Sequence, residues 1–198
     1  MSFSAGALLH GETVRVANLY REMRDWEKVR NHITDHNVLQ TRSGATTRRL
    51  LREICGRLET LTEDQLALLC NGVPDDQKHL LWLSLCRRYP FIREFAWEVV
   101  RERYLQPGPP ITFADFDTFY VAKEAWHPHL GDISWSTRRK LRQVLFRMLR
   151  EARFVSEDGY VVEAFLSPAL VRVLADDAPE DFNVFPVREE DVERWAQQ

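Results

Sequence analysis

The chain has 198 residues, a hydrophobic content of 44% and a formal net charge of −3 at pH 7. This length can bury one large core or two small ones, and no apolar run approaches the roughly 18 to 20 residues of a membrane span. The N-terminal stretch lacks the basic residues of a signal peptide. The composition therefore argues against a membrane protein and predicts a cytoplasmic one.

The first half of the chain shows helical periodicity throughout. Apolar residues at helical spacing predict helices over residues 9–24, 25–35, 46–59, 62–70, 75–88 and 91–104. The predicted core of this bundle comprises Leu19, Val29, Leu50, Leu51, Ile54, Leu58, Leu66, Leu69, Leu80, Leu81, Trp82, Leu85, Phe91, Phe95 and Val99. Cys55, Cys70 and Cys86 lie in these apolar patterns, which predicts buried thiols rather than disulfides or metal ligands.

A basic cluster accompanies the third of these helices. The segment 41–47 is rich in hydroxyls and leads into a helix that carries several arginines. Hydroxyls and free amides beside arginines form a plausible phosphate site; helix capping with a solvated face is the alternative. The candidate nucleic-acid contacts here are Arg42, Arg48, Arg49 and Arg52, and Arg57 follows on the same helix.

The segment Gln106–Pro110 divides the chain. Three prolines and one glycine in five residues cannot continue a helix. We therefore predict an all-α domain over residues 1–106 and a second domain over residues 111–198.

The second domain opens with a predicted helix over residues 112–125, and a strongly basic helix follows over residues 137–153. The basic helix carries seven basic residues and one acidic residue. Its apolar stripe comprises Leu141, Val144, Leu145, Met148, Leu149 and Ala152, and its phase places Arg139, Arg142, Gln143, Phe146, Arg150 and Arg153 on the outer face. Guanidinium and amide donors suit phosphates and base edges. A solvated helix whose arginines pair with carboxylates is the alternative.

Two short β-prone runs around Asp158–Gly159 follow the basic helix and predict a β-hairpin. The order helix, turn, basic helix and hairpin is that of a winged helix-turn-helix. Glu157 and Asp158 in the turn would repel phosphates, so we do not expect this wing to contact a groove strongly. The candidate nucleic-acid contacts of this domain are Arg138, Arg139, Lys140, Arg142, Gln143, Arg147 and Arg150.

The C-terminal tail is acidic from Asp176 onward, which is typical of a solvated end; a docking surface or a cover for the basic helix are the alternatives. The sequence contains no nucleotide-binding or hydrolase motif. His32 and His36 have the spacing of a zinc pair, but Ile33 stands where the catalytic glutamate would be and no third ligand is evident. We therefore predict no catalytic residue, no metal site and no cofactor.

Several strings in this order resemble the BrxA family of small accessory proteins from bacterial BREX phage-exclusion systems. They are Leu19–Trp26, Asn37–Arg42, Thr46–Glu53, Leu81–Ile92, Phe95–Val99, Ser136–Arg142 and Phe146–Glu151. The resemblance implies a cytoplasmic, non-catalytic protein that binds DNA beside other BREX components. It also implies a mainly α fold, with an N-terminal helical bundle similar to NusB and a C-terminal winged helix-turn-helix.

Together these observations predict binding to double-stranded DNA with low sequence specificity. Two alternatives remain at this point. One is an assembly adaptor whose basic helix docks on an acidic protein, and the other is an RNA-binding accessory factor, because a NusB-like domain leaves RNA open as a ligand. Long helices with many aromatic residues are also compatible with a homodimer.

Overall fold

The computed structural model describes residues 6–127 and 130–196, so the start of the N-terminal stretch considered as a signal peptide lies outside it. The first half contains α1 (His10–Met23), α2 (Trp26–Asp35), α3 (Gly44–Leu58), α4 (Glu63–Asn71), α5 (Pro74–Arg88), α6 (Pro90–Phe95), η1 (Ala96–Arg101) and α7 (Glu102–Leu105). Every helix predicted here is present. The last predicted one corresponds to α6, the π-helical η1 and α7, which follow one another without a break.

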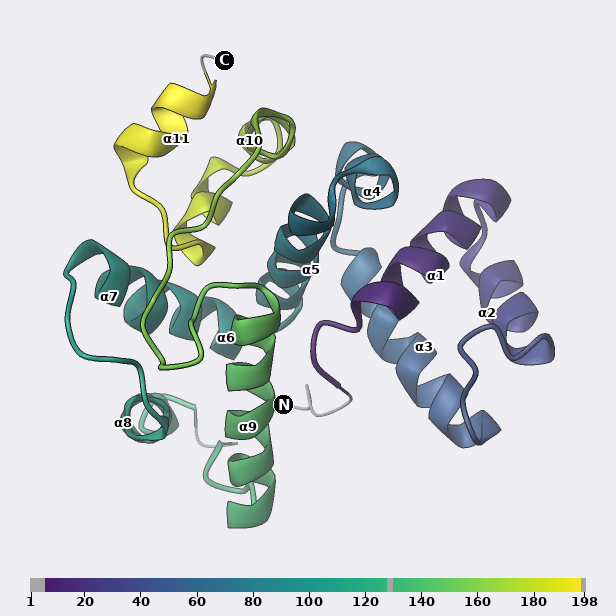
Figure 1. Cartoon of the computed structure of the whole chain (residues 1–198). Coiled ribbons are helices and arrows are strands. Elements are labelled where there is room, and N and C mark those ends of the chain that lie inside the picture. Colours follow the sequence, from purple (N-terminus) through teal and green to yellow (C-terminus); the bar gives the residue numbers. More distant parts are fainter. Residues whose placement is uncertain (1–5, 128–129, 197–198) are drawn as a thin grey trace.

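The second half contains α8 (Phe113–Glu124), α9 (Trp135–Glu151), α10 (Pro168–Ala175), η3 (Pro179–Val184) and α11 (Glu189–Ala196). In Figure 1, α1 to α3 lie on one side of α5 and α9, while α8, α10 and α11 lie on the other. The mainly α class is confirmed. No helix in the described part of the chain is long and apolar enough to cross a bilayer.

One buried apolar cluster includes residues from both halves. The predicted bundle core is confirmed, except that Leu19, Leu50 and Val99 are only partly buried. Trp82 of α5 is fully buried, its ring lies edge-on to Phe154 at 5.5 Å, and its Nε1 donates to the carbonyl of Val184 at 2.8 Å. Residues of the second half therefore pack against α5 and accept one of its hydrogen bonds.

The cysteines behave largely as predicted. All three are free thiols; Cys55 and Cys86 are buried, whereas Cys70 is half-buried. Burial raises the pKa of each thiol above its usual value. Low reactivity follows for the two buried ones.

The turn after α9 is smaller than a hairpin. A single antiparallel bridge joins Val155 to Val161, and the described residues form no longer strand. The amide of Ile111 donates to the carbonyl of Gly159 at 2.8 Å. Gly159 has a φ of +88°, and a Cβ there would lie 2.9 Å from the Ile111 oxygen, so glycine fits where a side chain would strain. The turn is thus held against the segment that leads into α8.

A buried ion pair holds the segment that precedes α1. Arg57 of α3 is fully buried, and its Nε donates to Glu53 Oε1 at 2.7 Å. Its Nη1 donates to the carbonyls of Ala7 and Leu8 at 3.0 and 3.3 Å, while the amide of Leu8 donates to Glu151 Oε2 of α9 at 2.8 Å. Arg57 therefore belongs to the core rather than to a basic surface, although the sequence grouped it with the arginines of the third helix.

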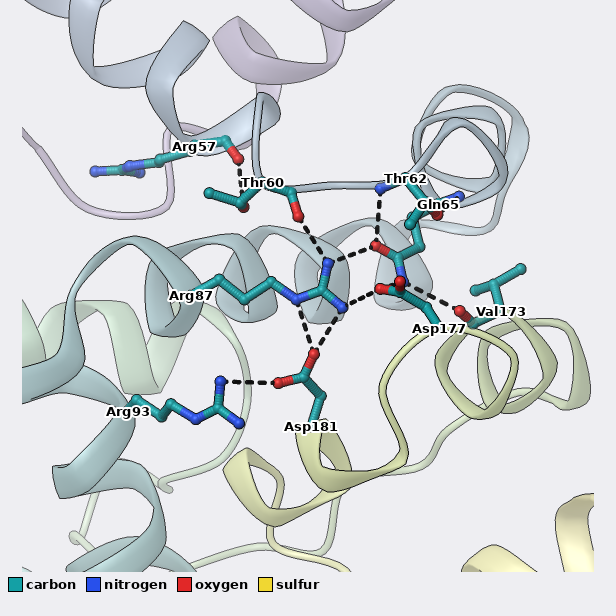
Figure 2. Close-up of polar contacts among 9 residues, drawn as sticks. All are labelled: Arg57, Thr60, Thr62, Gln65, Arg87, Arg93, Val173, Asp177 and Asp181. Carbon is teal, nitrogen blue, oxygen red and sulfur yellow. Dashed lines mark hydrogen bonds and ion pairs between the residues drawn. The ribbon is translucent and has the colours of Figure 1, made fainter.

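The C-terminal tail is not a solvated end near η3. Arg87 of α5 donates to Asp181 Oδ2 at 2.8 Å and forms an ion pair with Asp177 at 2.5 Å (Figure 2). Its Nη1 also donates to the carbonyl of Thr60 at 2.7 Å and to Gln65 Oε1 at 3.0 Å. Asp181 is only 1% exposed and forms a second ion pair, with Arg93, at 3.2 Å. The expectation of a solvated tail is wrong here, because these carboxylates neutralise arginines of α5 and α6.

A buried histidine should make the fold sensitive to acid. His79 is 4% exposed and stacks on Phe154 at 5.3 Å. Burial lowers its pKa from about 6.5 to about 4, although Asp75 opposes that shift. The unfolded chain therefore binds more protons between these values, and the free energy of unfolding should fall by up to about 3 kcal/mol as pH drops through this window.

Urea unfolding of the wild type and of His79→Leu from about pH 7 to pH 4 checks this expectation. In His79→Leu, the free energy of unfolding should no longer show the part of its pH dependence that His79 causes. His36→Gln is a matched control, since His36 is exposed, and it should keep the wild-type dependence. Parallel curves for the wild type and His79→Leu would contradict the assignment.

Candidate nucleic-acid interface

Helix α9 starts at a defined cap and with an unfavourable charge pattern. Ser134 Oγ accepts a hydrogen bond from the amide of Thr137 at 3.3 Å. No acidic side chain occupies the first turn, and three cations follow at Arg138, Arg139 and Lys140. Cations near a helix N-terminus oppose the helix dipole. Helix stability alone therefore does not account for them.

The inner face of α9 is wider than its predicted apolar stripe. Leu141, Leu145, Met148, Leu149 and Ala152 are buried as predicted, and Val144 is partly buried. Phe146 is also buried, with its ring 4.9 Å from Phe113 and 6.5 Å from Phe95. Its predicted place on the outer face is wrong because α6 and α8 both pack against α9.

Two arginines at the edge of this buried face contact α8. Arg138 Nη2 donates to the carbonyl of Asp117 at 3.0 Å, and the Arg138 guanidinium lies over the Tyr120 ring at 4.3 Å. Arg142 forms an ion pair with the Asp117 carboxylate and lies 4.5 Å from the Phe113 ring. Arg142 was expected opposite the apolar stripe, but its side chain is only 19% exposed. Both arginines therefore bind Asp117 within the fold, as the solvated-helix alternative supposed, whereas the buried Arg142 Nε has no hydrogen-bond partner among the described residues.

The outer face of α9 keeps a set of exposed polar side chains. They are Arg139, Lys140, Gln143, Arg147 and Arg150. Among the described residues, Lys140, Gln143 and Arg150 make no side-chain hydrogen bond or ion pair. Arg147 pairs with Glu151 at 2.8 Å but remains 71% exposed. This face therefore offers several cationic donors and one amide that the fold does not use.

The start of α3 is capped by its own hydroxyls. Ser43 Oγ accepts from the amide of Thr46 at 3.3 Å and also contacts the Thr46 hydroxyl at 3.0 Å. The hydroxyls of Thr41 and Thr47 bind each other. These groups are thus engaged in capping, which is the alternative considered for this segment.

The arginines around α3 remain exposed. Arg42, Arg48, Arg49 and Arg52 are exposed and form no ion pair with any described residue. A groove of about 560 Å³ runs between α2 and α3 and is lined by Arg30, Asn31, Thr34, Asp35, Arg48, Leu51, Arg52, Gly56, Glu59 and Arg88. In Figure 1 both α3 and α9 begin toward the lower side of the molecule. Two groups of cations near two helix starts therefore occur on that side.

The two histidines that have the spacing of a zinc pair lie close together. The rings of His32 and His36 lie 4.4 Å apart, and His36 Nδ1 is 2.9 Å from the carbonyl of His32. Within residues 6–127 and 130–196, no group of three or more histidine, cysteine or acidic side chains is placed to hold a metal ion.

The family model for BrxA matches residues 1–178. The chain belongs to the BrxA family. It is 28% identical over 150 residues to the BREX protein BrxA of Escherichia coli O9:H4 (strain HS), which covers 76% of this chain and 70% of that protein. It is 23% identical over 128 residues to the BREX protein BrxA of Bacillus cereus (strain H3081.97), covering 65% of this chain and 64% of that protein. The resemblance drawn from the sequence strings is thus confirmed.

A solved structure shares the fold of this BrxA-family chain. The crystal structure of an uncharacterized protein from Magnetospirillum magneticum aligns with a TM-score of 0.80, covers 93% of this chain and 96% of that chain, and is 19% identical in sequence. At that identity the likeness concerns the fold alone.

The sequence missed two residues that shape the start of α9. The carboxylate of Asp117 in α8 forms ion pairs with Arg138 and Arg142. Trp135 is the first residue of α9, and its side chain is 71% exposed. Helical phase could have placed Asp117 near the buried aromatic face of α8. It could not have shown the partners of Asp117, because they lie on another helix. Trp135 carried one available signal, because it immediately precedes the basic run.

Proposed function

We propose that this chain is a non-catalytic component of a BREX anti-phage system that binds double-stranded DNA with low sequence specificity. The outer face of α9 carries the proposal, because Lys140, Gln143 and Arg150 are exposed there without partners among the described residues. Arg139 and Arg147 lie on the same face. Cations that the fold does not neutralise suit phosphates, and the amide suits a base edge.

The arrangement around α9 supports a winged helix-turn-helix. Helix α8 is seen nearly end-on and α9 from the side in Figure 1, so the two helices cross steeply, as in helix-turn-helix motifs. The turn at Asp158–Gly159 then takes the place of the wing. Because the carbonyl of Gly159 accepts a hydrogen bond from the amide of Ile111, the turn is held against the fold, and in our proposal it contributes little to DNA contact. The boundary at residues 106–110 and the NusB-like character of the first half belong to the same proposal.

The arginines around α3 serve as a second phosphate contact in this proposal. Arg42, Arg48, Arg49 and Arg52 are exposed, and the neighbouring groove also offers Asn31 and Thr34. Amide and hydroxyl groups beside arginines can also hold a single-stranded RNA backbone. RNA binding is therefore the second candidate, and it would use the α2–α3 groove rather than α9.

The test is fluorescence anisotropy with labelled duplex DNA, single-stranded DNA, duplex RNA and single-stranded RNA from about 50 to 300 mM salt. If three or four phosphates are neutralised, log affinity for duplex DNA should fall with log salt at a slope of about −3 to −4. A slope near zero would contradict the proposal. Stronger binding to RNA would favour the second candidate, and no binding at the lowest salt would make the outer face of α9 a protein-docking surface.

A further inference from the structure

A small hollow lies at the start of α9. Its volume is about 270 Å³, and it is lined by Asp117, Trp135, Arg138, Arg139 and Arg142. These side chains comprise three guanidinium groups, one carboxylate and one indole. The hollow therefore combines a positive net charge with an aromatic surface.

The Trp135 ring is exposed to solvent and does not belong to the buried core. It is 71% exposed, and the Arg139 guanidinium lies over it at 5.6 Å. A large aromatic ring left in water forgoes the free energy that its burial would supply. Because most of the Trp135 side chain is exposed although Arg139 lies over its ring, ring surface remains that another flat group can contact.

The charges around the hollow are only partly neutralised. Asp117 serves both Arg138 and Arg142. Arg139 forms no hydrogen bond or ion pair with any described residue, and the Trp135 ring is the contact that holds it. Its five N–H donors are free for a phosphate, which binds arginine through two parallel hydrogen bonds.

We propose that this hollow binds one unpaired nucleotide of a DNA duplex, with its phosphate on Arg139 and its base stacked on Trp135. The inference rests on the proposed function and assigns the start of α9 a second task within it. A base inside a duplex has both faces covered by its neighbours, so an indole can stack only on a base that has left the stack. A duplex with an unpaired nucleotide offers such a base beside the phosphates that the outer face of α9 binds.

The experiment compares three short DNA duplexes of one sequence: fully paired, with one extra unpaired adenine nucleotide, and with an abasic residue in place of that nucleotide. The abasic duplex keeps the extra phosphate and removes only the base. We expect the wild type to bind the duplex with the unpaired adenine roughly 5- to 150-fold more tightly than the abasic one, as expected for one stacked base. Trp135→Ala should abolish this ratio, and Trp135→Phe should keep part of it.

Trp97→Ala is the matched control, because Trp97 is 48% exposed on η1 and does not line the hollow. It should keep the wild-type ratio. Equal binding of the adenine and abasic duplexes by the wild type, or an unchanged ratio in Trp135→Ala, would overturn the inference. The fully paired duplex tests the proposed function separately: salt-dependent binding of that probe without a base effect would leave the proposed function intact and remove only the stacking site.

Discussion

Replacing Asp181 with asparagine should lower the free energy of unfolding by about 3 to 5 kcal/mol, the usual cost of removing one partner from a buried ion pair. Asp181 is 1% exposed and pairs with Arg87 at 2.6 Å and with Arg93 at 3.2 Å. Asparagine keeps the shape of the side chain but removes the charge. Arg87 would then retain Asp177 as its carboxylate partner, and Arg93 would lose its ion pair with η3 (Figure 2).

Urea unfolding at pH 7 measures this effect, with Asp176→Asn as the matched control. Asp176 lies in the same acidic segment but is exposed, so its replacement should change the free energy of unfolding by less than about 0.5 kcal/mol. Equal stability of the two variants would show that the tail carboxylates do not anchor η3 on α5 and α6.

Replacing Arg139 and Arg150 together with glutamine should weaken binding to paired duplex DNA by about 100-fold at low salt, because each guanidinium would lose a charge-assisted contact with a phosphate. The salt slope should decrease in magnitude by about 2, one phosphate for each arginine. The loss should be similar for unrelated DNA sequences, since phosphate contacts carry no sequence information. Anisotropy across the salt series measures both quantities.

The matched control for that variant is Arg172→Gln with Arg194→Gln, which changes the net charge equally on α10 and α11, where both arginines are exposed. It should bind DNA within about 2-fold of the wild type if proximity to phosphate governs the effect. Thermal melting should be the same for both pairs and the wild type. A similar loss of affinity in both pairs would point to net charge rather than to the outer face of α9.

The helices of this chain could be predicted because their signals are local. The apolar stripe of α9 and the helix starts at Thr62 and Pro74 depend on residues within a few positions. The same holds for Leu80 and Leu81, which are buried in α5 as predicted. Local periodicity was therefore enough for the mainly α class and for most of the bundle core.

The predictions that were wrong concern residues whose partners lie far away in the sequence. Helical phase predicted that Arg142 lies on the outer face of α9, but it forms an ion pair with Asp117 of α8. Asp181 looked like part of a solvated tail because Arg87 and Arg93 lie about 90 positions earlier. Single-helix phase cannot show how wide an arc the neighbouring helices cover, and for the same reason Phe146 was misplaced.

The anchoring of the N-terminal segment affects how the chain can fold as it is synthesised. Ala7 and Leu8 are held by Arg57 and Glu151, which lie 50 and 143 positions later, respectively. Contacts across such separations form late, because the intervening chain must first be ordered. Leu8 therefore remains without its partner Glu151 until α9 has been synthesised.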